Sequence, residues 1–161
     1  MRSIEPLIDA ALPQLIELRH DLHSHPELSY NEYRTAGRVL EKLQALPGLD
    51  IRTGVAETGI VATLGAEKKG PCVALRADMD ALPIEEQTGA AYASQEKGKM
   101  HACGHDGHTT CLVGAAQILH GLADELQGPV KFVFQPAEEG GAGAKRMCEE
   151  GVLKDPEVSA I

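Results

Sequence analysis

The sequence predicts an α/β fold built around a mixed sheet. The run 72–75 is apolar at every position, which is typical of a strand that is covered on both faces. Residues 108–126 then carry apolar side chains at helical spacing, and residues 130–134 form the next strand pattern. A strand, a helix and a second strand in this order form a crossover unit, in which the two strands are parallel.

The composition is that of one globular domain with a core of small aliphatic residues. The chain has 161 residues, of which 43% are hydrophobic and 3% aromatic, and it contains no Trp. This length and apolar content exclude a disordered protein. The net charge of −9 argues against a nucleic-acid-binding surface, which needs a basic face. No apolar run approaches the roughly 18 residues of a membrane span, so we expect neither nucleic acid nor membrane as a partner.

The four cysteines follow no pairing pattern and predict no disulfide framework. Cys72, Cys111 and Cys148 lie in apolar or helical patterns, so we expect them to be small buried residues. Polar residues and a proline interrupt any apolar stretch near the N-terminus, so this region is not a signal peptide. Together these features predict a reducing compartment, the cytoplasm.

Two helices are expected before the first strand. Residues 3–22 carry an amphipathic stripe, although Pro13 should kink the helix that they form. A second helix should run to about Leu46, and a Pro-Gly pair ends it. Ser29 and Glu32, three residues apart, predict a capping box at its start.

The remaining elements surround the crossover unit. Residues 51–55 and 59–64 are expected to form an antiparallel hairpin. Residues 84–100 have no clear period and predict a surface excursion. A helix is expected from about residue 142 to 150, and a further strand begins at Val158.

Chemically active side chains should converge at one edge of the sheet. Two acids follow the strand at 72–77, two more follow the strand at 130–134, and a thiol and an imidazole precede the crossover helix. The carboxyl ends of parallel strands and the start of their crossover helix share one edge, where α/β proteins place their sites. The converging residues are Asp78, Asp80, Cys103, His105, Glu138 and Glu139.

These residue types favour a metal-dependent enzyme. Thiolate, imidazole and carboxylate are ligands of zinc and its neighbours, and a bound metal lowers the pKa of water to about 7. In the pair Glu138-Glu139, one carboxylate can bind metal while the other acts as general base. The plainer interpretation of residues 100–108 is a polar turn with His101 and His108 on the surface. The three histidines at 20, 23 and 25 are interpreted as structural or rim residues.

Two other classes remain open at this point. Cys103 could be a nucleophile with His105 as its base, although residues two apart seldom reach the required geometry. Nearby carboxylates would also raise the pKa of the thiol. Alternatively, the chain could be a non-catalytic interaction or regulatory module that pairs through an open sheet edge.

Four motifs, in order, resemble the metal-dependent amidohydrolases of the M20 peptidase family. The resemblance is to the branch of hippurate hydrolases, N-acyl-amino-acid amidohydrolases (aminoacylases) and plant auxin-conjugate hydrolases, and it runs from near residue 10 to the end of the chain. The motifs are His20 to Leu28, Arg76 to Pro83, Met100 to His108, and Phe134 to Gly140.

The resemblance implies a fold, a cofactor and a reaction. The fold is a three-layer sandwich with a mixed, largely parallel sheet, as in zinc aminopeptidases, here incomplete at the C-terminus. The cofactor is a pair of divalent ions, zinc or manganese, and the substrate is an N-acyl amino acid. By this resemblance Cys103, His105 and Glu139 are metal ligands, Cys103 bridging, Glu138 is the general base, and Asp80 and Asp78 lie behind the ligands.

Members of this family run well past twice the length of this chain. They carry two further histidine ligands and an inserted lid domain that dimerises. By comparison, residues 1–161 are expected to be the N-terminal part of the catalytic domain, without the lid/dimerisation domain or the C-terminal part of the catalytic domain. We therefore expect a possible homo-oligomer for the longer protein. For residues 1–161 alone we expect weak metal binding, if any, and little activity.

Overall fold

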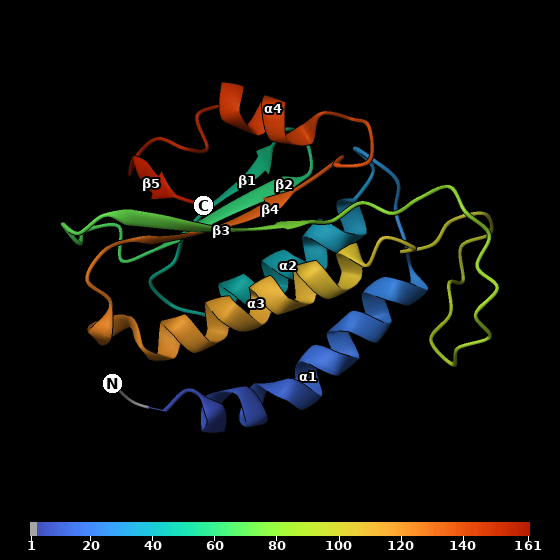
Figure 1. Cartoon of the computed structure of the whole chain (residues 1–161), viewed down its shortest axis with the longest axis horizontal. Helices are drawn as coiled ribbons and strands as arrows, with labels where there is room; N and C mark the ends of the chain where they lie inside the picture. The colour runs from blue at the N-terminus through green and yellow to red at the C-terminus, as the bar shows by residue number, and fades with distance from the viewer. Residues whose placement is uncertain (1–2) are drawn as a thin grey trace.

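The structure is a computed structural model that describes residues 3–161, and within them the chain forms one layered α/β unit (Figure 1). A five-stranded sheet with the order β1-β2-β4-β3-β5 lies between two layers of helix. Helices α1, α2 and α3 lie on one side of the sheet, and α4 lies on the other (Figure 1). The elements are α1 (Glu5–Ser24), α2 (Tyr33–Gln44), β1 (Asp50–Val55), β2 (Gly59–Leu64), β3 (Cys72–Asp78), α3 (His105–Gly121), β4 (Val130–Gln135), α4 (Gly143–Glu149) and β5 (Val158–Ala160).

The sheet is mixed, as predicted. Strands β3 and β4 are parallel, in a register that pairs Val73 with Val130 and Asp78 with Gln135. Strand β5 also runs parallel to β3, whereas β1–β2 and β2–β4 are antiparallel. Parallel and antiparallel pairings are thus equal in number within residues 3–161, because the hairpin strand β2 joins β4 directly. The register of β3 and β4 brings their carboxyl ends to the same edge.

The main core lies between the sheet and the three-helix layer. Phe132 and Phe134 of β4 are fully buried there, and the rest of the core is aliphatic. Helix α1 packs on α3, and the approach is close at Gly114, where an added Cβ would lie 2.7 Å from Cδ1 of Leu15. Helix α3 begins at His105, three residues before the predicted start, because Gly104 adopts the left-handed backbone conformation of its N-cap at φ 83°. Helix α3 therefore presents its first turn to the edge where β3 and β4 end.

The predicted capping box does not form. Ser29 and Glu32 make no capping bond to α2, and their side chains point to other segments. Glu27 caps the helix instead, because its carboxylate accepts the backbone N–H of Arg34 at 3.0 Å and of Thr35 at 2.7 Å. The prediction was wrong because longer-range contacts engage both side chains, Ser29 with Asp80 and Glu32 with Ala137.

The cysteine predictions were right for one residue and wrong for two. Cys72 is buried in β3, whereas Cys111 and Cys148 are exposed on their helices. All four cysteines are free. Residues 84–99 contain no helix or strand and form the expected surface excursion. Within residues 3–161, no helix is long and apolar enough to cross a membrane.

Candidate metal centre

The fold brings the predicted site residues together around the ring of His105. Asp78 ends β3, His105 begins α3, and Glu138 and Glu139 follow β4. Nε2 of His105 lies 3.6 Å from Asp78 Oδ1, 3.9 Å from Glu138 Oε2 and 3.8 Å from Glu139 Oε1. Three carboxylates therefore face one imidazole nitrogen, an arrangement that attracts a cation.

Cys103, His105 and Glu139 form a donor set that fits a metal ion. Their sulfur, nitrogen and oxygen ligand atoms all lie within 4.8 Å of one another. Oε1 of Glu139 is buried and has no hydrogen-bond partner among residues 3–161. A buried carboxylate oxygen without a partner is costly unless a cation satisfies it. This orphaned oxygen is the structural observation that favours a metal at these three residues.

The thiol of Cys103 is exposed and is not activated as a nucleophile. The neighbouring carboxylate of Glu139 raises the pKa of Cys103, and desolvation and the other nearby carboxylates raise it further. A raised pKa disfavours the thiolate, which is the reactive form. A metal ion would reverse this effect by binding the thiolate directly. The geometry therefore favours a ligand role over a metal-free thiol nucleophile.

His105 is oriented by the backbone of Asp80. Nδ1 of His105 lies 2.8 Å from the carbonyl oxygen of Asp80 and donates to it. In the neutral ring this bond places the proton on Nδ1, so Nε2 keeps the free lone pair that a metal ion needs. Burial opposes protonation, but the bond to Asp80 and the charge of Asp78 outweigh it and hold the pKa of His105 above its usual value.

The carboxylate of Asp80 binds the backbone of Glu138 and Glu139. Its Oδ1 accepts the backbone N–H of Glu138 at 2.9 Å, and its Oδ2 accepts that of Glu139 at 3.1 Å and the hydroxyl of Ser29 at 2.7 Å. Desolvation works against the charged form, yet these bonds and that with His105 lower the pKa of Asp80 to about 2. Asp80 is fully engaged in hydrogen bonds and acts as a support for the site.

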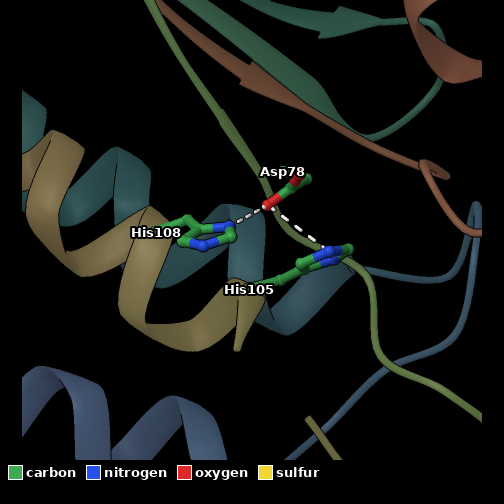
Figure 2. A group of neighbouring side chains, drawn as sticks. All are labelled: Asp78, His105 and His108. Atoms are coloured by element: carbon green, nitrogen blue, oxygen red, sulfur yellow. Dashed lines mark hydrogen bonds and ion pairs between the residues drawn. The ribbon is translucent and has the colours of Figure 1, made fainter. Parts of the chain in front are cut away.

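Asp78 belongs to a second group of possible ligands, with His105 and His108 (Figure 2). Its Oδ1 lies 2.7 Å from Nδ1 of His108, and its Oδ2 lies 2.8 Å from Nη1 of Arg76. The guanidinium already neutralises this carboxylate and would repel a second cation. Within residues 3–161, Glu139 pairs with no Lys or Arg, so the Cys103 group is the better metal position.

Sequence reasoning missed a buried polar cluster behind the site. His101 is 4% exposed, and both of its ring nitrogens lack a partner within residues 3–161. Desolvation is the main reason that the pKa of His101 falls to about 4. His23 lies between Asp106, at 2.9 Å, and Glu86, at 3.3 Å, which agrees with a structural role. No local pattern marks these residues as buried, because their partners come from distant segments.

A mixed α/β sheet with thiol, imidazole and carboxylate donors gathered beyond its parallel strands is typical of metal-dependent α/β enzymes. Residues 74–161 match the model of Peptidase family M20/M25/M40, and the chain belongs to this family.

Curated relatives are similar over nearly the whole chain. It is 51% identical over 140 residues to "N-acetyl-L-cysteine deacetylase" of Bacillus subtilis (strain 168), covering 87% of this chain and 33% of the relative. It is 50% identical over 143 residues to "IAA-amino acid hydrolase ILR1-like 2" of Arabidopsis thaliana, covering 89% of this chain and 32% of the relative. The chain thus spans about a third of the length of these relatives.

Solved structures share the fold. The YXEP protein of Bacillus subtilis, described as a dinuclear metal-binding peptidase from the M20 family, superposes with a TM-score of 0.88 at 45% identity, over 95% of this chain and 42% of that one. Human carnosine dipeptidase 1 superposes with a TM-score of 0.73 at 17% identity, over 97% of this chain and 39% of that one. The first match is to a protein described as binding two metal ions, and the second match shows the fold alone.

Proposed function

We propose that residues 1–161 are the N-terminal part of the catalytic domain of a metal-dependent amidohydrolase that cleaves the amide bond of N-acyl amino acids. The convergence of Cys103, His105 and Glu139 on one point carries this proposal. The names of the similar proteins, which include a deacetylase of N-acetyl-L-cysteine and an amino-acid conjugate hydrolase, support the substrate class. The lid/dimerisation domain and the rest of the catalytic domain then lie outside these residues.

Cys103, His105 and Glu139 are proposed to hold a pair of divalent ions, zinc or manganese. One sulfur, one nitrogen and one carboxylate oxygen suit zinc, and the carboxylate also suits manganese. When bound, such ions polarise the scissile carbonyl and lower the pKa of water towards about 7. Three side chains cannot complete two coordination spheres, so we expect residues 1–161 alone to bind metal weakly and to have little activity.

Glu138 is the proposed general base. Its side chain is 42% exposed and lies beside the ligands, while Asp80 holds its backbone. Its carboxylate accepts a proton as the oxygen of water attacks the carbonyl carbon of the amide. The same proton passes to the amine nitrogen as the carbon–nitrogen bond breaks. The products are a carboxylic acid and a free amino acid.

The remaining parts of the proposal concern location and partners. We propose a cytoplasmic enzyme, supported by four free cysteines. Small N-acyl amino acids, hippurate-like compounds among them, are its proposed partners, and nucleic acid and membrane are not. Possible homo-oligomers would form through the part of the protein outside these residues.

A cobalt titration of residues 1–161 tests the metal centre. The wild-type chain is expected to develop a thiolate-to-cobalt charge-transfer absorption. Cys103→Ser should abolish this absorption, whereas Cys111→Ser, which changes another exposed free cysteine, should retain it. Charge transfer that survives in Cys103→Ser would contradict the proposal, because the absorption requires sulfur from Cys103. In the longer protein, a chelator should stop hydrolysis of N-benzoylglycine, whereas mild alkylation of thiols should not. The reverse pattern would favour a metal-free thiol hydrolase.

A further inference from the structure

Three consecutive backbone N–H groups after β4 are bound by side-chain carboxylates from distant segments. Those of Glu138 and Glu139 bind Asp80, and that of Ala137 donates to Oε1 of Glu32 at 2.9 Å. Glu32 lies 105 residues away from Ala137 in the sequence. The turn that carries both glutamates of the site is therefore anchored from outside at each of its first three residues.

Glu32 is an unusual residue for this position. It is 0% exposed, and its second oxygen accepts the hydroxyl of Thr58 at 2.5 Å. Burial raises the pKa of Glu32 above its usual value, which means that the surroundings penalise the charge. An apolar residue of similar size would avoid the cost of burying a carboxylate. The hydrogen bond to Ala137 offers a functional reason for the charge.

The same short segment contacts the turn at two further points. Ser29 donates its hydroxyl to Oδ2 of Asp80 at 2.7 Å, and Tyr30 donates its hydroxyl to the carbonyl of Gly141 at 2.5 Å. Segment 29–32 thus contacts the beginning of the turn, its end and its main support.

The turn needs such support because its backbone is strained. Ala137 and Ala142 both have positive φ, 52° and 55°, which residues with a side chain rarely adopt. A conformation of this kind persists when the surrounding contacts impose it. Without the bond from Glu32, the N–H of Ala137 would be buried and unpaired.

We propose that Glu32 is a positioning residue: by binding the N–H of Ala137, it fixes the turn 137–141 so that Glu138 and Glu139 face His105 and Cys103. This inference rests on the proposed function, because it assigns the turn a role in metal binding. Groups that orient metal ligands typically contribute 10- to 100-fold in affinity. Glu32 is expected to act in that range through the backbone of the turn.

Amide hydrogen exchange in the metal-free chain tests the contact without relying on metal. In Glu32→Ala, the protection of the amides of residues 137–139 should fall at least about tenfold, with smaller changes elsewhere. Thr58→Val is the matched control, because it removes the other partner of Glu32 and leaves the bond to Ala137 in place. A uniform loss of protection over the whole chain in Glu32→Ala would indicate general destabilisation and overturn the proposal.

Zinc affinity, measured by competition with a chromophoric chelator, tests the consequence. Glu32→Ala should bind zinc about 10- to 100-fold more weakly than wild type. Glu32→Gln keeps an oxygen acceptor and should stay within about threefold of wild type, as should Thr58→Val. Wild-type zinc affinity in a folded Glu32→Ala chain, or an equal loss in Thr58→Val, would overturn the positioning role.

Two outcomes need a further measurement: a Glu32→Ala chain that does not fold, and a wild-type chain that binds no zinc. If Glu32→Ala does not fold, Tyr30→Phe replaces it, because this variant removes only the hydroxyl that binds Gly141. It should increase exchange at residues 140–142 and weaken zinc binding several-fold, and an unchanged Tyr30→Phe would then count against a positioning role for segment 29–32. If the wild-type chain binds no zinc, the affinities are compared in the longer protein. Absence of zinc binding there would contradict the proposed function, while the exchange pattern still decides whether Glu32 holds the turn.

Discussion

The carboxylate of Asp80 accepts the backbone N–H of Glu138 at 2.9 Å. The other carboxylate oxygen of Asp80 accepts the backbone N–H of Glu139. The backbone carbonyl of Asp80 accepts the N–H at Nδ1 of His105. Asp80, two residues after the end of β3, therefore fixes the turn after β4 and the first residue of α3. Because these contacts cross between three segments, Asp80 determines how the candidate ligand atoms of His105 and Glu139 face one another.

Asp80→Asn is expected to weaken metal binding without removing a ligand. The amide group can replace only one carboxylate oxygen, and its NH2 group would face a backbone N–H. We expect zinc affinity to fall about 10- to 100-fold and the free energy of unfolding to fall by about 1–3 kcal/mol. Chelator competition and urea unfolding measure the two effects. Asp124→Asn, at an exposed acid, is the control, and an equal effect of that variant would contradict a specific role for Asp80.

The contribution of Asp80 to stability should depend on pH. Its pKa in the folded chain is about 2, below its ordinary value of 3.8, so the unfolded chain binds the proton more readily. The stabilisation, about 2 kcal/mol, is therefore fully present above pH 4 and is lost as pH falls from about 4 to 2. Urea unfolding of wild type and Asp80→Asn across this range should show their difference shrinking. A constant difference would show that the charge of Asp80 does not matter.

Glu138→Gln should separate chemistry from metal binding in the longer protein. The amide is nearly isosteric but cannot accept the proton of the attacking water. We expect kcat to fall roughly 100- to 10,000-fold, with zinc affinity within about threefold of wild type. Steady-state hydrolysis of N-acetylcysteine and chelator competition measure these quantities. Glu149→Gln, at an exposed glutamate of α4, is the matched control. If Glu138→Gln retained most of its activity, another residue would have to be the base.

His108→Ala distinguishes the two possible ligand groups. Asp78 is already paired with Arg76, so a metal at Cys103, His105 and Glu139 should not need His108. We expect zinc affinity to change by less than about threefold, since a lost hydrogen bond of an exposed side chain has a small effect. A loss comparable to that of Cys103→Ser would place the metal on the other side of His105, at Asp78 and His108.

The general position of the site could be predicted because connectivity alone determines it. A crossover unit makes β3 and β4 parallel, and parallel strands end at one edge, so Asp78 and Glu139 had to lie near the start of α3. The side-chain spacing of the apolar runs was sufficient for this inference. It required no knowledge of individual contacts.

The supports of the site could not be predicted, because they depend on contacts between distant residues. Ser29 and Glu32 satisfy a capping pattern locally, but Asp80, Thr58 and Ala137 compete for them in the folded chain. Glu27 then caps α2 from outside the pattern. Local motifs describe which bonds a residue can make, whereas the tertiary fold selects which bonds it does make.

Burial of single residues was also hard to predict. Cys111 and Cys148 lie in helical patterns but are exposed in the structure. The helical pattern alone does not show which face of a helix packs against the rest of the fold. His101 shows the opposite case, since a polar residue in a turn is almost fully buried by segments far away in the sequence.

The most direct test of the account is the X-ray absorption spectrum of the zinc-loaded chain. If Cys103, His105 and Glu139 hold the ion, the spectrum should contain sulfur at about 2.3 Å together with nitrogen and oxygen at about 2.0–2.2 Å, and the sulfur should vanish in Cys103→Ser. A zinc ion surrounded only by nitrogen and oxygen in the wild-type chain would contradict the central claim.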